Sequence, residues 1–146
     1  MWTIKEFSQL TGVSPVALRY YDKEKILPSK RLANGYRSYD QTDLLIVKNL
    51  VVLKYAGFSL EDIKTMTSLY HEPEGQACND QANEVLTRNL QEMKERIKLF
   101  NQIIEVVEGI MPLFENHELY KLNQSELNQS IDQIFDQIST GKGTIT

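Results

Sequence analysis

The strongest constraint on the fold of this chain is a heptad repeat in its second half. Between residues 86 and 111, apolar side chains recur at alternating intervals of four and three residues. They belong to Leu86, Leu90, Met93, Ile97, Phe100, Ile104, Val107 and Met111. A period of about 3.5 residues is typical of a coiled-coil seam. The pattern predicts a helix over residues 80–111, about 48 Å long at roughly 1.5 Å per residue.

An apolar stripe of this length needs a partner to cover it. We expect a second copy of the chain to supply that partner, so that the heptad residues form the interface of a homodimer. The alternative is packing within the chain against residues 112–146. This segment contains one further amphipathic helix, with Leu127, Ile131, Ile134 and Ile138 on its apolar face.

The first part of the chain carries the signals of a small helical domain. Thr3 and Glu6 have the spacing of a capping box at the start of a helix. Gly12 ends this helix and the pair Ser14-Pro15 begins the next, because serine caps helices and proline is tolerated at their first position. Two short helices joined at a glycine turn predict a helix-turn-helix.

A β-hairpin and two further helices complete this head, which spans residues 1–70. Asn34-Gly35 favours a type I′ turn, because both residues tolerate a positive φ, and the flanking residues then form a wing. Asp40 and Ser59 each have an acidic residue three positions later and cap a third and a fourth helix.

The polar residues 71–79 contain proline and glycine and are expected to form a linker between the head and the long helix. The predicted fold is therefore mostly α. It has a winged helix-turn-helix head at residues 1–70, a coiled-coil dimerisation helix at residues 80–111 and a short C-terminal helical segment at residues 112–146.

Charge is distributed unevenly along the chain. Residues 1–39 contain seven Lys and Arg against three Asp and Glu, whereas residues 40–146 contain nine against seventeen, within a net charge of −4. A basic head on an acidic body is the pattern of a module that binds a polyanion.

Cationic and phenolic side chains are concentrated on two elements of the head. Six of them lie on the second helix and on the two strands of the wing, namely Arg19, Tyr20, Lys30, Arg31, Arg37 and Tyr39. Because guanidinium, ammonium and phenol groups all donate hydrogen bonds to phosphate oxygens, these residues are candidate contacts to DNA. Tyr21 fills an apolar position of the helix-turn-helix pattern and is assigned to the core instead.

Three segments of the head carry a resemblance to a known family. LRYYD (18–22), NGYRSYD (34–40) and GFSLEDIK (57–64) occur in this order and spacing, and the long helix follows them. On these motifs, residues 1–69 resemble the N-terminal domain of the MerR family of bacterial transcription regulators.

The resemblance implies a mode of action. Members of this family bind a palindromic promoter operator in double-stranded DNA as homodimers whose long helices pair antiparallel. The operator lies between promoter elements separated by an overlong spacer. Effector binding makes the dimer bend and untwist that spacer, so that RNA polymerase, an indirect partner, engages both elements.

The resemblance also assigns roles to matching residues. Arg19, Tyr20, Arg37 and Tyr39 match positions that contact phosphates, on the second helix and on the wing. Lys25 stands at the end of the recognition helix, where many members have a glycine, a place that often favours a left-handed residue.

The recognition helix itself departs from a common form of the motif. Ser14, Val16 and Ala17 match positions that face the major groove, but a basic residue and a threonine are common where Val16 and Ala17 stand. An apolar side chain contacts a thymine methyl group but cannot form a bidentate hydrogen bond with guanine. Base specificity is therefore not predicted.

The effector is predicted less directly. Cys78 lies just before the long helix, where metal-sensing members place a cysteine. The sequence has no other cysteine and only two histidines, His71 and His117, so we expect no metal site. Cys78 is either a reactive thiol that senses electrophiles or oxidants or an inert packing residue. Residues 112–122, together with the C-terminal helix, either bind a small apolar effector or pack against the coiled coil.

Other classes of function lack support in the sequence. No paired nucleophile and base, carboxylate pair or phosphate-binding glycine loop is recognisable, so we expect no enzyme and no cofactor. We also expect a cytoplasmic protein without a membrane partner, because no run of about 18 apolar residues and no secretory signal occurs. The alternative function is a helical protein-interaction adaptor, which explains the heptads but not the basic head.

Overall fold

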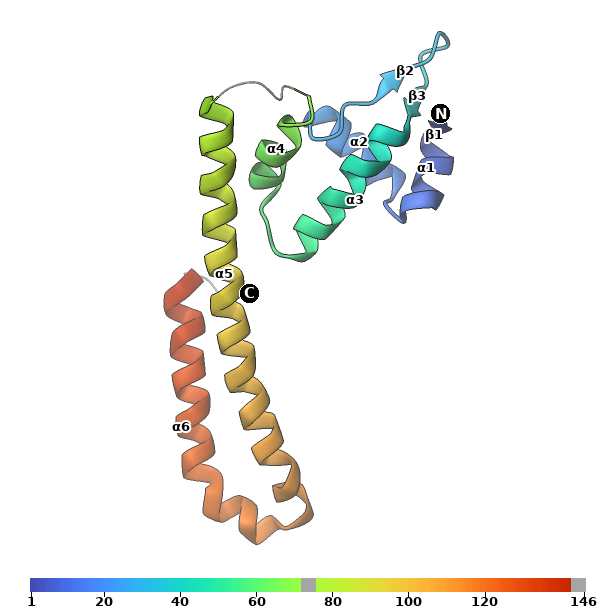
Figure 1. Cartoon of the computed structure of the whole chain (residues 1–146). Helices are drawn as coiled ribbons and strands as arrows, with labels where there is room; N and C mark the ends of the chain where they lie inside the picture. Colours follow the sequence, from blue (N-terminus) through green and yellow to red (C-terminus); the bar gives the residue numbers. More distant parts are fainter. Residues whose placement is uncertain (72–75, 143–146) are drawn as a thin grey trace. The chain divides into compact units, whose positions relative to one another are not determined.

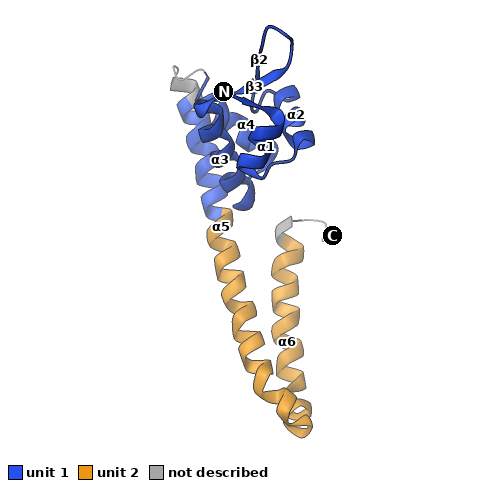
Figure 2. Cartoon of the chain, turned by 90° about the vertical axis from the view of Figure 1, so that its right-hand side faces the viewer, with its two compact units in different colours: residues 1–91 blue, residues 92–146 orange. Residues whose placement is uncertain are grey.

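The computed structural model describes residues 1–71 and 76–142, and it leaves out the side chains of residues 76–78, 141 and 142. The described residues are mostly helical and fall into two compact units, Met1–Gln91 and Glu92–Thr146 (Figures 1 and 2). No helix among them combines the length and the hydropathy needed to cross a bilayer. The mostly α, winged helix-turn-helix class predicted from the sequence is confirmed.

Unit 1 begins with the predicted pair of short helices, α1 (Ile4–Thr11) and α2 (Pro15–Lys23). The capping box is formed, since the Thr3 hydroxyl accepts from the Glu6 N–H at 3.4 Å and the Glu6 carboxylate accepts from the Thr3 N–H at 2.8 Å. Gly12 ends α1 with a φ of 72°, in the left-handed region that glycine adopts without strain. Ser14 caps α2 by accepting a hydrogen bond from the Ala17 N–H at 3.2 Å.

The wing belongs to a small antiparallel sheet in the order β1-β3-β2. Its strands are β1 (Trp2–Thr3), β2 (Lys30–Arg31) and β3 (Arg37–Tyr39). Strand β1 was not predicted, because two residues directly before a helix carry no periodic pattern of their own.

The tip of the wing differs from the predicted type I′ turn. The Gly35 N–H donates to the Leu32 carbonyl at 2.8 Å and the Leu32 N–H donates to the Tyr36 carbonyl at 2.9 Å. Gly35 has a φ of 81°, whereas Asn34 is not among the residues with positive φ. These bonds describe a three-residue loop in which a turn is followed by one left-handed glycine, the next most common hairpin geometry.

The core of unit 1 lies where the first three helices meet the sheet. The rings of Phe7 and Tyr39 stack with centroids 4.4 Å apart and an interplanar angle of 3°. The side chains with no exposed surface are Phe7, Leu18, Leu27, Tyr39, Ile46, Val47, Leu50 and Ile63. Burial of aromatic and aliphatic area of this kind is the dominant favourable term in folding.

Helices α3 (Gln41–Tyr55) and α4 (Leu60–Ser68) are capped at Asp40 and Ser59 as predicted. The carboxylate of Asp62 on α4 then accepts hydrogen bonds from Arg88 and Asn89 on the next helix, α5 (Gln76–Ile110). Burial raises the pKa of Asp62, but the bonds from Asn89 and Arg88 outweigh it and lower this pKa overall. The first part of α5 is thus fastened to α4 within unit 1.

Helix α5 begins at Gln76 and ends at Ile110, close to the predicted bounds of 80 and 111. In unit 2 it leads through the 3-10 helix η1 (Met111–Glu115) into α6 (His117–Lys142). Figure 2 shows α6 running back alongside the second part of α5 as a helical hairpin. Asn116 caps α6, because its side-chain oxygen accepts from the Glu118 N–H at 3.1 Å.

Within unit 2, α5 presents two different faces. The face towards α6 carries Gln102, Val106 and Gly109, which line a cavity together with residues of α6. At 3.6 residues per turn, the heptad residues of this part of α5 lie about 180° away from that face. Ile97, Phe100, Ile104 and Val107 are between 49% and 62% exposed, and Met111, the first residue of η1, is 65% exposed. The alternative in which the C-terminal helix covers the heptad stripe is therefore wrong for this part of the chain.

Candidate nucleic-acid interface

Helix α2 has one exposed face. Val16 is 73% exposed, Tyr20 is 45% exposed, and Arg19 and Lys23 are also exposed. These residues are spaced three and four apart, so they lie along one side of the helix. The opposite side is in the core, where Tyr21 is buried as predicted.

The N-terminus of α2 holds the predicted groove-facing residues. Ser14 is exposed, and although its oxygen accepts from Ala17, its hydroxyl hydrogen remains a donor. Val16 is exposed and Ala17 is half-buried. This end of α2 therefore offers methyl groups and one hydroxyl donor, but no cation.

The wing carries two arginines directly opposite each other, since Arg31 on β2 and Arg37 on β3 are Cα partners in the antiparallel register. Both lie close to Asp22 of α2. Oδ2 of Asp22 is 2.7 Å from Nε of Arg37 and 3.8 Å from a terminal nitrogen of Arg31. A single carboxylate therefore joins α2 to both strands of the wing.

Asp22 is held by a further bond, because its Oδ1 accepts from the Ser29 N–H at 2.8 Å. Burial raises the pKa of Asp22, but the bonds from Ser29 and Arg37 outweigh it and lower this pKa overall. A lowered carboxyl pKa means that the ionised group stabilises the fold at neutral pH. This contribution is lost as the pH falls through the folded-state pKa, below the ordinary range of aspartate.

Lys30 forms an ion pair with Asp40, the residue that caps α3. This hydrogen bond raises the pKa of Lys30 and lowers the pKa of Asp40. The Lys30 side chain is nevertheless 60% exposed, so its ammonium group remains accessible to a further anion. Arg31 is similarly accessible, with 54% of its side chain exposed.

The prediction that Tyr39 presents its hydroxyl outward to phosphate is wrong. Tyr39 is fully buried against Phe7, and neither its hydroxyl nor that of Ser29 has a hydrogen-bond partner among the described residues. Burial, and then the nearby charge of Asp22, raise the pKa of the Tyr39 phenol. Pairing of β3 with β1, in which Tyr39 opposes Trp2, turns this ring into the core.

Two residues of the candidate DNA-binding surface, which α2 and the wing form, were not predicted from the sequence to belong to it. Lys23 lies four residues after Arg19 and seven after Val16, and this helical spacing was a usable signal for the same exposed face. Asp22 had no such signal, because its partners lie 7 to 15 positions away in the sequence. In contrast to Arg37, the guanidinium of Arg19 has no ion-pair partner among the described residues.

Lys25 has a φ of 59°, the left-handed conformation expected at the end of the recognition helix. The left-handed backbone conformation is about 1 kcal/mol or more less favourable for a residue with a Cβ than for glycine. Lys25→Gly is therefore expected to raise the free energy of unfolding by about 1 kcal/mol. Urea titration at fixed protein concentration measures this change. Lys23→Gly, at the last residue of α2, is the matched control and should lower the stability; an unchanged or lower stability for Lys25→Gly would contradict the assignment.

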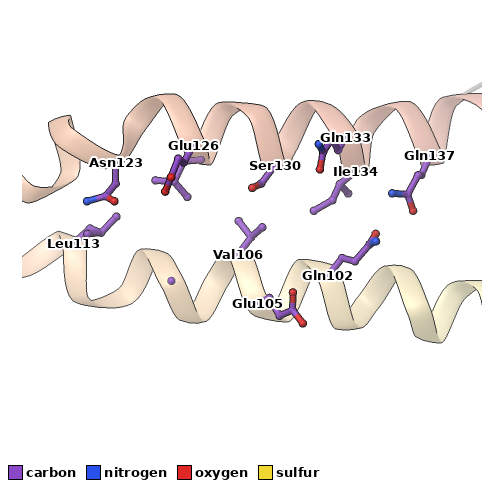
Figure 3. A pocket seen from close by; sticks show the side chains of 12 residues that line it. Gln102, Glu105, Val106, Leu113, Asn123, Glu126, Ser130, Gln133, Ile134 and Gln137 are labelled. Carbon is purple, nitrogen blue, oxygen red and sulfur yellow. The ribbon is translucent and has the colours of Figure 1, made fainter.

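Unit 2 contains a cavity of about 420 Å³ between α5 and α6. Figure 3 shows Val106 of α5 and Ile134 of α6 pointing towards the gap between the two helices. The other side chains around it are mostly polar, among them Gln102, Ser130 and Gln137. This lining suits a polar occupant better than the apolar effector considered for this part of the chain.

The sensing role considered for Cys78 concerns a side chain outside the described part of the structure. Among the side chains that are described, no group of three or more His, Cys, Asp or Glu residues is placed to hold a metal ion.

Comparison with known proteins identifies the family. A model of the MerR HTH family regulatory proteins matches residues 2–69, and a second, described as MerR, DNA binding, matches residues 47–109. The HTH-type transcriptional regulator ZntR of Escherichia coli (strain K12) is 34% identical over 98 residues, which are 66% of this chain and 69% of ZntR. The chain belongs to the MerR family. This MerR-family protein is a DNA-binding transcription regulator and not an enzyme.

Solved structures agree with this assignment. The MerR-family chain is similar to a MerR family transcriptional regulator from Listeria monocytogenes, with a TM-score of 0.69 and 25% identity over 91% of this chain and 98% of that one. It also shares its fold with HiNmlR, a MerR family regulator lacking the sensor domain, at a TM-score of 0.68 and 24% identity over 80% of this chain and 92% of that one.

Proposed function

We propose that this MerR-family protein binds a palindromic operator in promoter DNA as a homodimer and controls transcription by bending and untwisting the spacer DNA in response to an effector. The observation that carries the proposal is the exposed face of α2 beside a basic wing, with both joined through Asp22. HiNmlR, which shares the fold, was solved bound to promoter DNA.

Phosphate contacts are assigned to the accessible cations of this surface. Arg19 and Lys23 lie on α2, and Lys30 and Arg31 lie on the wing. Arg37 has one N–H engaged by Asp22, and the four other donors of a guanidinium remain for a phosphate. Tyr20, which is 45% exposed, adds a phenol hydroxyl on the same face as Arg19.

Base contacts are assigned to the N-terminal end of α2. Val16, with its side chain 73% exposed, and Ala17 contribute methyl groups suited to thymine, and Ser14 contributes a hydroxyl donor. With so few base-reading groups, a large share of the sequence preference is expected to come from the deformability of the spacer.

The homodimer is supported by the exposed heptad stripe of α5. Seven of its eight residues are between 41% and 65% exposed, which is unusual for large apolar side chains that recur at heptad spacing. In an antiparallel pair of such helices, a two-fold axis relates the two identical heads, which matches the symmetry of a palindrome. An effector that binds one state of this dimer more tightly than the other then changes the bend and twist of the spacer DNA. RNA polymerase engages both promoter elements once the spacer is bent and untwisted.

Fluorescence anisotropy with a duplex from the promoter of its own or a neighbouring gene tests the proposal. We expect binding at least about a thousandfold tighter than to a scrambled duplex, because specific sites typically exceed non-specific ones by this factor or more. The logarithm of the association constant should fall linearly with the logarithm of the salt concentration, with a slope of about −0.9 for each phosphate neutralised. Equal affinity for both duplexes, or no binding even at low salt, would refute the proposal.

A further inference from the structure

The wing contains an electrostatic conflict that the fold has to resolve. Arg31 and Arg37 are directly opposite each other on neighbouring strands. Like charges in this position destabilise a strand pair. Oδ2 of Asp22 lies 2.7 Å from Arg37 and 3.8 Å from Arg31, so its negative charge offsets the repulsion between the two guanidinium groups, and Arg31 also donates a hydrogen bond to the Gly35 carbonyl at 3.0 Å.

The same carboxylate fixes the wing to the recognition helix. Its Oδ1 accepts from the backbone of Ser29, the residue directly before β2, and its Oδ2 accepts from Arg37 on β3. The side chains of Asp22 and Arg37 are only 16% and 24% exposed, so this bond is shielded from water and salt. Three segments of the head thus meet at one side chain.

We propose that Asp22 is a positioning residue for DNA binding, which fixes the wing to α2 and holds Arg31 and Arg37 in an arrangement ready for phosphate. The inference rests on the proposed function, since it assigns these arginines to phosphate. A carboxylate and a phosphate offer guanidinium groups similar acceptor oxygens. Asp22 accepts a hydrogen bond from Nε of Arg37 and leaves the other guanidinium N–H groups for a phosphate. The Arg37 side chain is therefore ordered before DNA binds and loses less conformational entropy on binding.

This role predicts the opposite sign from simple electrostatics. Removing a negative charge beside a polyanion site should tighten DNA binding if Asp22 acts only through its charge. As a positioning residue, Asp22 should instead favour binding. Asp22→Asn, which keeps the size of the side chain, is then expected to weaken promoter binding about tenfold, the equivalent of one charged hydrogen bond.

Three further variants complete the test. Asp22→Glu keeps the charge but displaces it by one methylene, and it should also weaken binding. Arg37→Gln should weaken binding by itself, and adding Asp22→Asn to it should weaken binding less than Asp22→Asn does alone, because the bond between the two residues is already lost. Asp132→Asn, at an exposed carboxylate of α6, is the matched control and should bind like the wild type.

A spectroscopic measurement keeps the test independent of DNA and of folding defects. In the free wild-type protein, the Arg37 Nε–H resonance should be protected from exchange, and in Asp22→Asn it should shift and lose protection. If the wild-type protein binds the promoter and the folded Asp22→Asn variant binds it equally or more tightly, the positioning role is overturned and the proposed function stands. If the wild-type protein binds no promoter, the proposed function is overturned, and with it the role of Asp22 in DNA binding. A protected Arg37 resonance in that protein would show that Asp22 still attaches the wing to α2.

Discussion

Ile97→Asp is expected to convert the homodimer into monomers and to remove specific promoter binding. Ile97 is 60% exposed in the single chain and lies near the middle of the heptad stripe. In an antiparallel pair, both copies of the substituted side chain therefore fall near the centre of the interface. Burying two unpaired carboxylates should raise the dimer dissociation constant by at least roughly a thousandfold.

Light scattering and sedimentation at several protein concentrations measure this change. Because position 97 is exposed in the single chain, the helix content of the variant should stay close to that of the wild type. Asn128→Asp introduces the same side chain at an exposed position of α6 and should remain a dimer. A dimer that survives Ile97→Asp would show that the stripe is not the interface.

Arg19→Ala is expected to weaken promoter binding by about tenfold to a hundredfold and to reduce its salt dependence. The Arg19 guanidinium is exposed on α2 and has no ion-pair partner among the described residues, so its removal should leave the fold intact. Each subunit of the variant then neutralises one phosphate fewer than the wild type. The slope of log affinity against log salt should therefore become shallower by about one for each subunit.

The weakening should be similar for specific and scrambled duplexes, because an interaction with phosphate carries little sequence information. Lys121→Ala removes an exposed cation from α6 and serves as the control, with unchanged affinity and slope expected. An Arg19→Ala protein with the wild-type salt slope would refute the phosphate role of Arg19, whatever its affinity.

Features of the fold that depend on near neighbours in the sequence were predicted well. The caps at Thr3, Ser14, Asp40 and Ser59 are all present, because a capping side chain bonds a backbone group only two or three residues away. The heptad spacing likewise located a single long helix to within four residues at its start. Such signals depend on the local helix geometry and need no knowledge of tertiary contacts.

Features that depend on pairing between distant segments were not predicted. The burial of Tyr39 follows from the register of β3 with β1 and from the stack on Phe7, partners more than 30 positions away. The side chains of β3 do not alternate simply between surface and core either, since Ser38 and Tyr39 are both buried. Period-two reasoning placed Arg37 and Tyr39 together on the surface for this reason.

The candidate interface shows the same division. Residues on α2 could be placed on one face from their spacing alone, and Val16, Arg19 and Tyr20 are exposed there. The role of Asp22 could not be anticipated, because it arises only when the folded wing brings Arg37 within 2.7 Å of α2. Single side chains that tie together distant segments become visible only with the tertiary structure.

The mass of the complex with a palindromic promoter duplex, measured by light scattering at a salt concentration that suppresses non-specific binding, tests the central proposal most directly. A winged head on a paired α5 helix predicts a complex of two chains and one duplex, with no stable complex on a duplex that contains a single half-site. A complex of one chain and one duplex, equally stable on the half-site, would contradict binding as a dimer held together by the heptad stripe.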